Sequence, residues 1–405
     1  MKYLFTLLLA ILLIMPLSSH DDAWSAAKKT TKKSAPAKTT AKPASKAPAA
    51  AAATATAAGA AAATEPEPQP VWPAGPAGDA AKAWAGGDEK TAREIWEKMA
   101  ADGDAQAMNN LGVVYDQGLG VEPDPGRAAH WFAQSANAGN PSGMSNYGRM
   151  LEQGRGMPAN AAEAARWFDQ AARKGQAEAQ YNLGLLYENG RGVDRDETAA
   201  AAWYSRAASQ NQKDALARLG HFYRIGRGVA KDERRAALLL YAAAMEGSVP
   251  AIEELESMAK ESGKTSDAAL FGQKLNETSR TAMREAIKKS GAKVKREDNA
   301  HICDIYDSTA AVPGSGEMAV CYGPDQRLGF LKIDYAAPDN TRADAIYKMV
   351  EGRFGSPTAG EGEDARLWNL GPVIVATKYA PTHSQMSLMY MVPRVYHLTK
   401  GNPSK

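Results

Sequence analysis

The sequence predicts a multidomain chain, in which a superhelical solenoid of antiparallel α-helix pairs is followed by a small α+β domain with an antiparallel sheet. Two observations carry this prediction. One pattern of glycines and aromatic residues recurs every 36 residues over four consecutive copies in the middle of the chain. Residues 293–405 instead contain short β-rich runs separated by turn residues. A fixed period of this length is typical of stacked units that each need a neighbour to bury their apolar face.

The first 25 residues have the layout of a secretory signal. Lys2 is followed by an apolar run from Tyr3 to Met15, which is shorter than the roughly 20 residues needed to cross a bilayer. Ala23 and Ser25 suit the small positions that precede a cleavage site. We therefore expect residues 1–25 to be removed on export and no transmembrane span to remain. The alternative is that the segment is retained as a membrane tether.

Residues 26–76 form a predicted disordered linker. They consist almost wholly of Ala, Lys, Thr and Pro, a composition that cannot bury enough apolar surface to offset the entropy lost on ordering. Seven lysines and no acidic residue lie between positions 26 and 48. The linker is either a plain spacer or a segment that contacts an anionic envelope surface. The net charge of +2 says little by itself, and we expect no nucleic-acid partner.

Residues 77–262 form the predicted solenoid. A half repeat at its N-terminal end and a capping helix at its C-terminal end are expected to flank four full repeats. The half repeat covers 79–104, the full repeats cover 105–140, 141–176, 177–212 and 213–248, and the capping helix covers 249–262.

Each full repeat is predicted to contain two helices. The first carries a glycine, such as Gly112, where a neighbouring helix must approach closely, and it ends at glycines that can adopt positive φ. The second begins at an N-cap residue such as Asp124 and carries an aromatic pair such as Trp131-Phe132. We expect these markers to be structural.

The third copy shows a recognisable family pattern. It reads Leu183-Gly184-x-x-Tyr187-x-x-Gly190-x-Gly192-Val193, followed by Asp196, Ala200, Trp203-Tyr204 and Ala207-Ala208. This pattern resembles a Sel1-like repeat, and all four copies match it. The resemblance implies a right-handed superhelix related to tetratricopeptide arrays, which acts as an adaptor for protein complexes. Some secreted members of the family carry a disulfide in every repeat, but the repeats of this chain contain no cysteine.

The C-terminal part is expected to begin with a helical connector. Apolar residues predict one amphipathic helix over 263–292 that stops at Gly291. In the α+β domain at 293–405, one covering helix is expected to start at Thr341 and to end before Gly355. The predicted strands cover 318–322, 328–335, 373–379 and 386–398. We recognise no family in this domain.

Cys303 and Cys321 are the only cysteines of the chain. Thiols of exported proteins tend to pair, and the loop at 310–315 lies midway between the two residues. A hairpin would place them opposite one another, so we expect a structural disulfide that contributes about 3 kcal/mol in the chain-entropy model. Two free thiols in the core are the alternative.

The sequence favours no catalytic, cofactor or metal site. Its Gly-x-Gly pairs follow helices, whereas a dinucleotide-binding loop follows a strand. Ser290 and Lys293 have the S-x-x-K spacing of serine acylases, but the partner motifs S-D-N and K-T-G are missing. The six histidines are scattered. We therefore expect no enzyme, no cofactor and no metal ion.

A polar stripe along the first helix of each repeat is the candidate site. Asparagine occupies one position in three copies, arginine replaces it in the fourth, and helical spacing adds two more basic residues. The candidate partner-binding residues are Asn110, Asn146, Asn182, Arg218, Arg149 and His221. An amide can pair with both the N–H and the C=O of an extended backbone, so we expect this stripe to line the concave side and bind a protein or peptide. The alternative is that the asparagines bond within the stack.

These observations favour an exported, non-enzymatic adaptor that binds a protein or peptide partner in the bacterial cell envelope, either in the periplasm or outside the cell. A second hypothesis is a protein that binds an envelope polymer through the Lys-rich linker and the C-terminal domain. A hydrolase activity in the C-terminal domain is the third.

Overall fold

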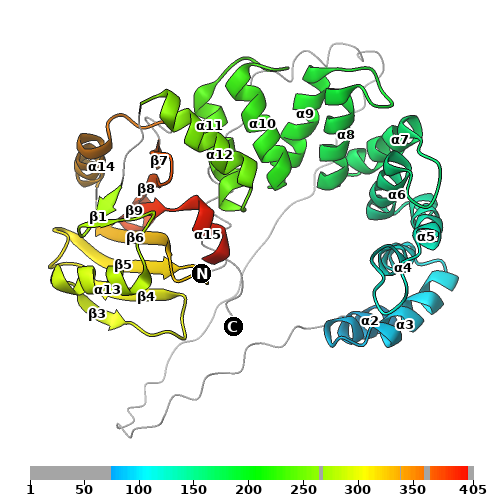
Figure 1. Cartoon of the computed structure of the whole chain (residues 1–405), viewed down its shortest axis with the longest axis horizontal. Coiled ribbons are helices and arrows are strands. Elements are labelled where there is room, and N and C mark those ends of the chain that lie inside the picture. Colours follow the sequence, from blue (N-terminus) through cyan, green and yellow to red (C-terminus); the bar gives the residue numbers. More distant parts are fainter. Residues whose placement is uncertain (1–73, 264–267, 338, 360–364, 400–405) are drawn as a thin grey trace, which may run out of the picture.

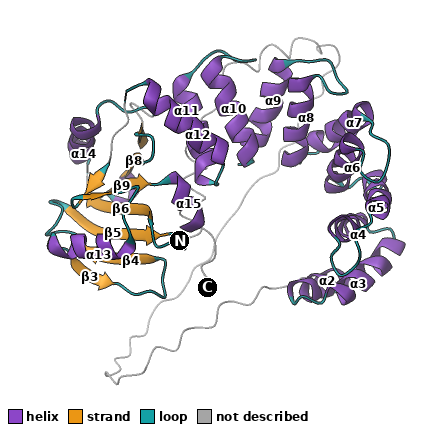
Figure 2. Cartoon of the chain, in the orientation of Figure 1, coloured by secondary structure: helices purple, strands orange, loops and turns teal. Residues whose placement is uncertain are grey.

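The computed structural model describes residues 74–263, 268–337, 339–359 and 365–399. The predicted signal and nearly all of the predicted linker lie outside these ranges. The described chain forms a curved row of helix pairs that ends against a sheet domain (Figures 1 and 2). None of its described helices is long and apolar enough to cross a membrane.

The solenoid consists of consecutive antiparallel helices, mostly 13 residues long. They are α2 (Pro76–Ala85), α3 (Glu89–Ala101), α4 (Ala105–Gln117), α5 (Pro125–Asn137), α6 (Pro141–Gln153), α7 (Ala161–Arg173), α8 (Ala177–Asn189), α9 (Glu197–Ala208), α10 (Lys213–Ile225), α11 (Glu233–Met245) and α12 (Val249–Glu261). The four pairs from α4 to α11 have the predicted repeat boundaries. The prediction of a half repeat at 79–104 is wrong, because α2 packs on α3 and the two helices form a complete pair. Helix α2 is shorter than the first helices of the other repeats. At the 36-residue step, Pro76, Lys82 and Trp84 stand where the marker glycines would be expected.

Each repeat is held by close packing between its two helices. A Cβ atom on Gly112 of α4 would lie 2.4 Å from the ring of Phe132 on α5, so only glycine permits this approach. Gly118 ends α4 with φ 71°, and Asp124 starts α5 by accepting a hydrogen bond from the Arg127 backbone N–H. Phe132 is fully buried, as the predicted core requires.

The C-terminal domain contains one antiparallel sheet of seven strands. In spatial order these are β3 (Lys293–Arg296), β4 (Cys303–Asp307), β5 (Ser315–Tyr322), β6 (Leu328–Ala336), β9 (Gln385–Met391), β8 (Ile374–Ala380) and β7 (Ala365–Asn369). The predicted runs at 318–322, 328–335 and 373–379 fall in β5, β6 and β8. The predicted strand at 386–398 is wrong in its second half, because Pro393 opens helix α15 (Pro393–Thr399). Strands β3 and β7 were not predicted, and β4 was expected only as part of the hairpin that joins Cys303 to Cys321.

The prediction of one helix over 263–292 is wrong. Among the described residues of this segment, α13 (Arg280–Lys289) is the only helix, and it follows a short hairpin of β1 (Ala269–Leu270) and β2 (Gln273–Lys274). Phe271 and Gly272 turn this hairpin with φ of 52° and 75°, which an α-helix cannot contain. Leu275 and Met283 are fully buried in the core of the sheet domain. The segment therefore packs as part of that domain and not as a connector.

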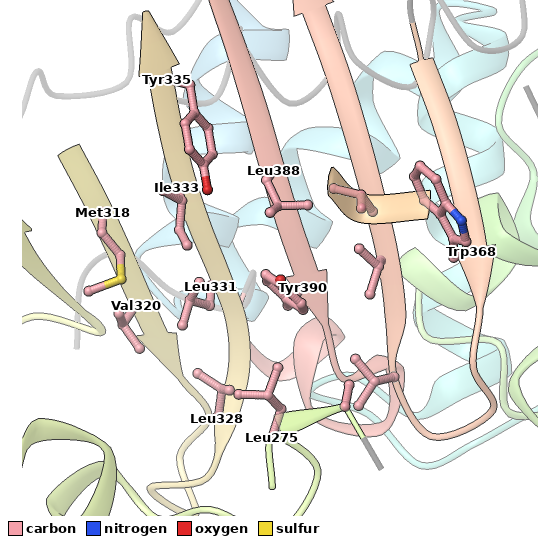
Figure 3. Packing of buried hydrophobic residues seen from close by; sticks show 14 of the residues in the cluster. Leu275, Met318, Val320, Leu328, Leu331, Ile333, Tyr335, Trp368, Leu388 and Tyr390 are labelled. Atoms are coloured by element: carbon pink, nitrogen blue, oxygen red, sulfur yellow. The ribbon is translucent and has the colours of Figure 1, made fainter. Parts of the chain in front are cut away.

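The sheet is covered on both faces. On one face, side chains such as Leu331, Leu388 and Tyr390 form a core with α13 and α14 (Asn340–Phe354), as Figure 3 shows for the strands. One covering helix was expected, and two are present. The opposite face meets α15 and the end of the solenoid, where Phe330 and Met391 join a single apolar cluster with Tyr241 of α11, among others.

The C-terminal end of the solenoid is thus closed mainly by the sheet domain. Helix α12 forms as predicted, but it does not cover an open end alone. The Asn369 Nδ2 atom donates to the Leu255 carbonyl at 2.7 Å, and Arg394 of α15 pairs with Glu256 at 2.8 Å. Because one apolar cluster spans both parts, the solenoid and the sheet domain stabilise each other.

The disulfide between Cys303 and Cys321 is present, as predicted. The two residues lie directly opposite each other in the β4–β5 register, so a hairpin brings them together as expected. The bond lies on the sheet face that meets the solenoid, where Cys321 is buried in the shared apolar cluster.

Candidate protein-binding surface

The predicted polar stripe lies on the first helix of each repeat. In Figure 1, α4 and α6 lie on the inner side of the curve, and their partners α5 and α7 lie on the outer side. Asn110, Asn146 and Asn182 are half-buried, whereas Arg218 in the fourth repeat is exposed. The stripe therefore follows the junctions between successive first helices, with part of each side chain open to solvent.

Two of the three asparagines are hydrogen-bonded within the stack. The Nδ2 atom of Asn146 donates to Oδ1 of Asn109 at 2.9 Å, and its Oδ1 accepts from Arg149 at 3.3 Å. The Oδ1 atom of Asn110 accepts from Gln106 at 2.9 Å. Asn182 differs, since its amide makes no side-chain hydrogen bond among the residues that the structure describes. The three equivalent positions therefore do not have equivalent roles.

A ladder of ion pairs, which sequence reasoning missed, links the repeats. An acidic residue near the end of each first helix pairs with an arginine in the following repeat's inter-helix loop. The pairs are Asp116–Arg155 at 2.8 Å, Glu152–Arg191 at 3.0 Å and Glu188–Arg227 at 3.0 Å. Both members recur at the 36-residue step, so the signal was present in the sequence. Because the carboxylates are largely buried, each needs its cation to offset desolvation.

Two predicted site residues add a second cation to this ladder. Arg149 lies 3.7 Å from Asp116, and Arg218 lies 3.6 Å from Glu188. Glu188 also accepts a hydrogen bond of 2.5 Å from the Tyr204 hydroxyl. Burial, together with this contact, raises the pKa of Tyr204 far above its usual value. Asp116 and Glu188 therefore each face two cations, and Glu188 also accepts from a hydroxyl.

The ladder changes sign where the solenoid meets its last helix. In the fourth repeat the acidic position is occupied by Arg224, whose guanidinium reaches Glu254 of α12 at 3.2 Å. His221, the remaining predicted site residue, places Nδ1 2.9 Å from the same carboxylate. Glu254 thus links α12 to α10 through Arg224 and His221, so one ring nitrogen of His221 already has a partner within the solenoid.

The sheet domain contains a separate buried charge cluster. Asp304 on β4 is fully buried and pairs with Arg280 and Arg284 of α13, each at 2.8 Å. Burial alone would raise the pKa of Asp304, but the hydrogen bonds from the two arginines outweigh burial and lower the pKa. The cluster ties α13 to the sheet and is a structural element.

The acylase-like pair has no catalytic geometry. The Ser290 hydroxyl donates to the Ile287 carbonyl at 2.6 Å at the end of α13, and Lys293 lies on β3. Within the described ranges, no group of three or more His, Cys, Asp or Glu side chains is placed to hold a metal ion.

These features define a helical-repeat solenoid closed by a small sheet domain. The model of the Sel1 repeat family matches residues 105–140, 141–176, 177–212 and 213–248. The middle of the chain therefore consists of four Sel1 repeats, at the boundaries that the sequence pattern predicts. Arrays of this kind typically present their concave surface to other proteins.

Solved structures of Sel1 repeat proteins are similar to this chain. A Sel1 repeat protein from Oxalobacter formigenes is 37% identical over 42% of this chain and 50% of its own, with a TM-score of 0.39. The c5321 protein, a protective antigen present in uropathogenic Escherichia coli strains, is 27% identical over 49% and 41%, with a TM-score of 0.41. Cysteine rich protein B of Helicobacter pylori is 24% identical over 33% and 95%, with a TM-score of 0.28. The chain spans half or less of the first two structures, and no curated protein matches it.

Proposed function

We propose that the chain is an exported adaptor that binds a protein or peptide partner along the concave side of its repeats, in the cell envelope. One observation carries this proposal. The amide of Asn182 is half-exposed on the inner stripe and has no side-chain partner within the described structure. A half-exposed amide without a side-chain partner can donate a hydrogen bond to the backbone of an extended segment and accept one from it.

Neighbouring residues support a site around this amide. Leu185 lies on the same helix as Asn182, Arg149 lies on α6 and Arg218 lies on α10, so the first helices of three successive repeats carry polar and apolar groups. Successive helices pack roughly 10 Å apart, and an extended chain advances about 3.3 Å per residue. One repeat therefore corresponds to about three residues of a bound segment.

Export is proposed from two features. Residues 1–25 have the pattern of a secretory signal, and the disulfide between Cys303 and Cys321 is typical of a chain that folds in an oxidising compartment. We propose that the protein acts by binding and not by catalysis, since the polar side chains of its candidate site recur along a helical array.

The test is affinity capture from crosslinked envelope extract with the full chain and with its Asn182→Ala variant. We expect the variant to bind its partner about fivefold to thirtyfold more weakly and to capture correspondingly less of it, because the amide would supply one or two hydrogen bonds of about 1 kcal/mol each. Asn137→Ala is the matched control, since Asn137 is exposed at the end of α5. Equal capture by the Asn182→Ala variant and the wild type would refute a site at this amide.

A further inference from the structure

On the inner stripe, Asp116 and Glu188 each face two arginines, and the members of these ion pairs differ in exposure. The Asp116 and Glu188 side chains are 7% and 6% exposed, whereas those of Arg149 and Arg218 are 42% and 47% exposed. The carboxylate of each pair therefore lies beneath the surface and the guanidinium lies above it. At these two pairs an approaching partner meets the cation and not the anion.

Arg149 and Arg218 are also the more distant of the two arginines that face each buried carboxylate. Asp116 has a closer partner in Arg155 at 2.8 Å, and Glu188 has closer partners in Arg227 at 3.0 Å and in the Tyr204 hydroxyl at 2.5 Å. Guanidinium carries five N–H donors and prefers to bind carboxylates in a bidentate manner. Arg149 and Arg218 therefore have donors available for a second carboxylate without releasing the buried one.

We propose that Arg149 and Arg218 bind carboxylate side chains of the partner, and that the partner segment is an extended acidic peptide. This inference rests on the proposed function and specifies the chemistry of its ligand. The two arginines lie on α6 and α10, two repeats apart, which corresponds to roughly 20 Å. At about 3.3 Å per residue, the two acidic residues of the segment are about six positions apart. Asn182 and Leu185 lie between the two arginines and contact the intervening backbone and side chains.

The same surface disfavours a densely charged polyanion. Glu178 and Asp214 lie at the start of α8 and α10 on the same stripe, where Glu178 is exposed and Asp214 half-exposed. Acidic residues repel a polymer that carries a charge on every unit, while a peptide can place neutral residues beside them. The half-buried Leu185 likewise fits an apolar side chain and not a phosphate.

Fluorescence anisotropy with two labelled peptides tests the proposal on the full chain. The first peptide carries two glutamates about six residues apart in a Ser, Gly and Leu background, and the second has glutamine at both positions. We expect the glutamate peptide to bind roughly tenfold tighter or more. Arg149→Gln and Arg218→Gln should each weaken this binding about tenfold, and Arg166→Gln on α7 should leave it unchanged.

These substitutions are chosen so that folding is preserved. After Arg149→Gln the Asp116 carboxylate keeps Arg155, and after Arg218→Gln the Glu188 carboxylate keeps Arg227 and Tyr204. Thermal melting of each variant verifies this expectation.

Three results would overturn the acidic-peptide inference. They are the absence of measurable binding by the glutamate peptide, equal affinity for both peptides, and tighter binding of inorganic polyphosphate at the same two arginines. If the glutamine peptide binds equally and Asn182→Ala still weakens it, the concave site survives and only its charge preference is wrong. Binding that is indifferent to Asn182 and to both arginines would reject the proposed function as well.

Discussion

The Asn146 side chain donates from Nδ2 to Oδ1 of Asn109 at 2.9 Å, across the boundary between the first and second repeats. Asn109 is 6% exposed, so this bond satisfies a buried amide. One step further along the solenoid, Asn182 makes no side-chain bond within the described residues. Identical residues at the same repeat position are therefore divided between holding the stack and facing solvent.

This division predicts opposite effects for two alanine substitutions. Asn146→Ala should lower the free energy of unfolding by about 1–3 kcal/mol, because it leaves the buried Asn109 amide without its partner. Asn182→Ala should change that free energy by less than about 0.5 kcal/mol and should weaken partner binding. Urea unfolding of the two variants, measured beside wild type, provides the comparison. Equal destabilisation by both substitutions would show that Asn182 stabilises the fold and would contradict its assignment to partner binding.

The ion-pair ladder predicts unequal roles for two arginines that face the same carboxylate. Arg227→Gln should destabilise the fold by about 1–3 kcal/mol, since Glu188 is almost fully buried and Arg227 is its nearer cation. Arg218→Gln serves as the matched control and should cost much less, because Arg218 lies farther away and is about half exposed. If urea unfolding shows that both variants lose a similar free energy of unfolding, Arg218 is needed for the fold and is not free to bind a partner.

Asp304 predicts an acid-dependent part of the stability. Its pKa in the folded protein lies below the unfolded value of about 3.9, because Arg284 and Arg280 outweigh the effect of burial. A lowered pKa stabilises the folded state at every pH above the unfolded value, and this contribution is lost as the pH falls through the folded pKa. Asp304→Asn should therefore lower stability at pH 7 and flatten the decline below about pH 4. Asp344→Asn, at an exposed position on α14, is the control.

Reduction of the disulfide is expected to destabilise more of the chain than the β4–β5 hairpin. Reduction of Cys303–Cys321 should cost about 3 kcal/mol by the chain-entropy relation. Because Cys321 lies in the apolar cluster shared with the solenoid, reduction should shift the main thermal transition of the whole chain. Calorimetry with and without reductant measures the shift, and intact mass verifies the gain of two hydrogens. A separate low-temperature transition confined to the sheet domain would contradict this coupling.

The repeat architecture could be predicted because its determinants are local and recur. Gly112 and its equivalents mark where two helices touch, and Gly118 marks where a helix must end, so the period alone gives the register. The Cys303–Cys321 pairing was also predictable, since a single turn separates the two residues. The same spacing predicts that the candidate residues lie on the first helix of each repeat, where the structure has them.

The remaining features depend on contacts that are distant in the sequence. Strand β3 lies at the sheet edge, is mostly exposed and has Val294 as its one apolar residue, so it has no apolar alternation to reveal it. The Leu270 to Ile287 run resembles a helical face, but Phe271 and Gly272 turn it into a hairpin that packs on the sheet. The difference between Asn146 and Asn182 is set by which neighbour lies one repeat away, and the repeat pattern does not contain that information.

Site-specific photocrosslinking in the full chain tests the central claim most directly. A photoreactive benzoylphenylalanine replaces Leu185, at the centre of the concave stripe, and in a second variant it replaces Ala202, which is exposed on α9. Irradiation of cells or envelope extract should yield a covalent adduct of defined mass from position 185 and none from position 202. Adducts that form from position 202 but not from position 185 would contradict a partner site on the concave side.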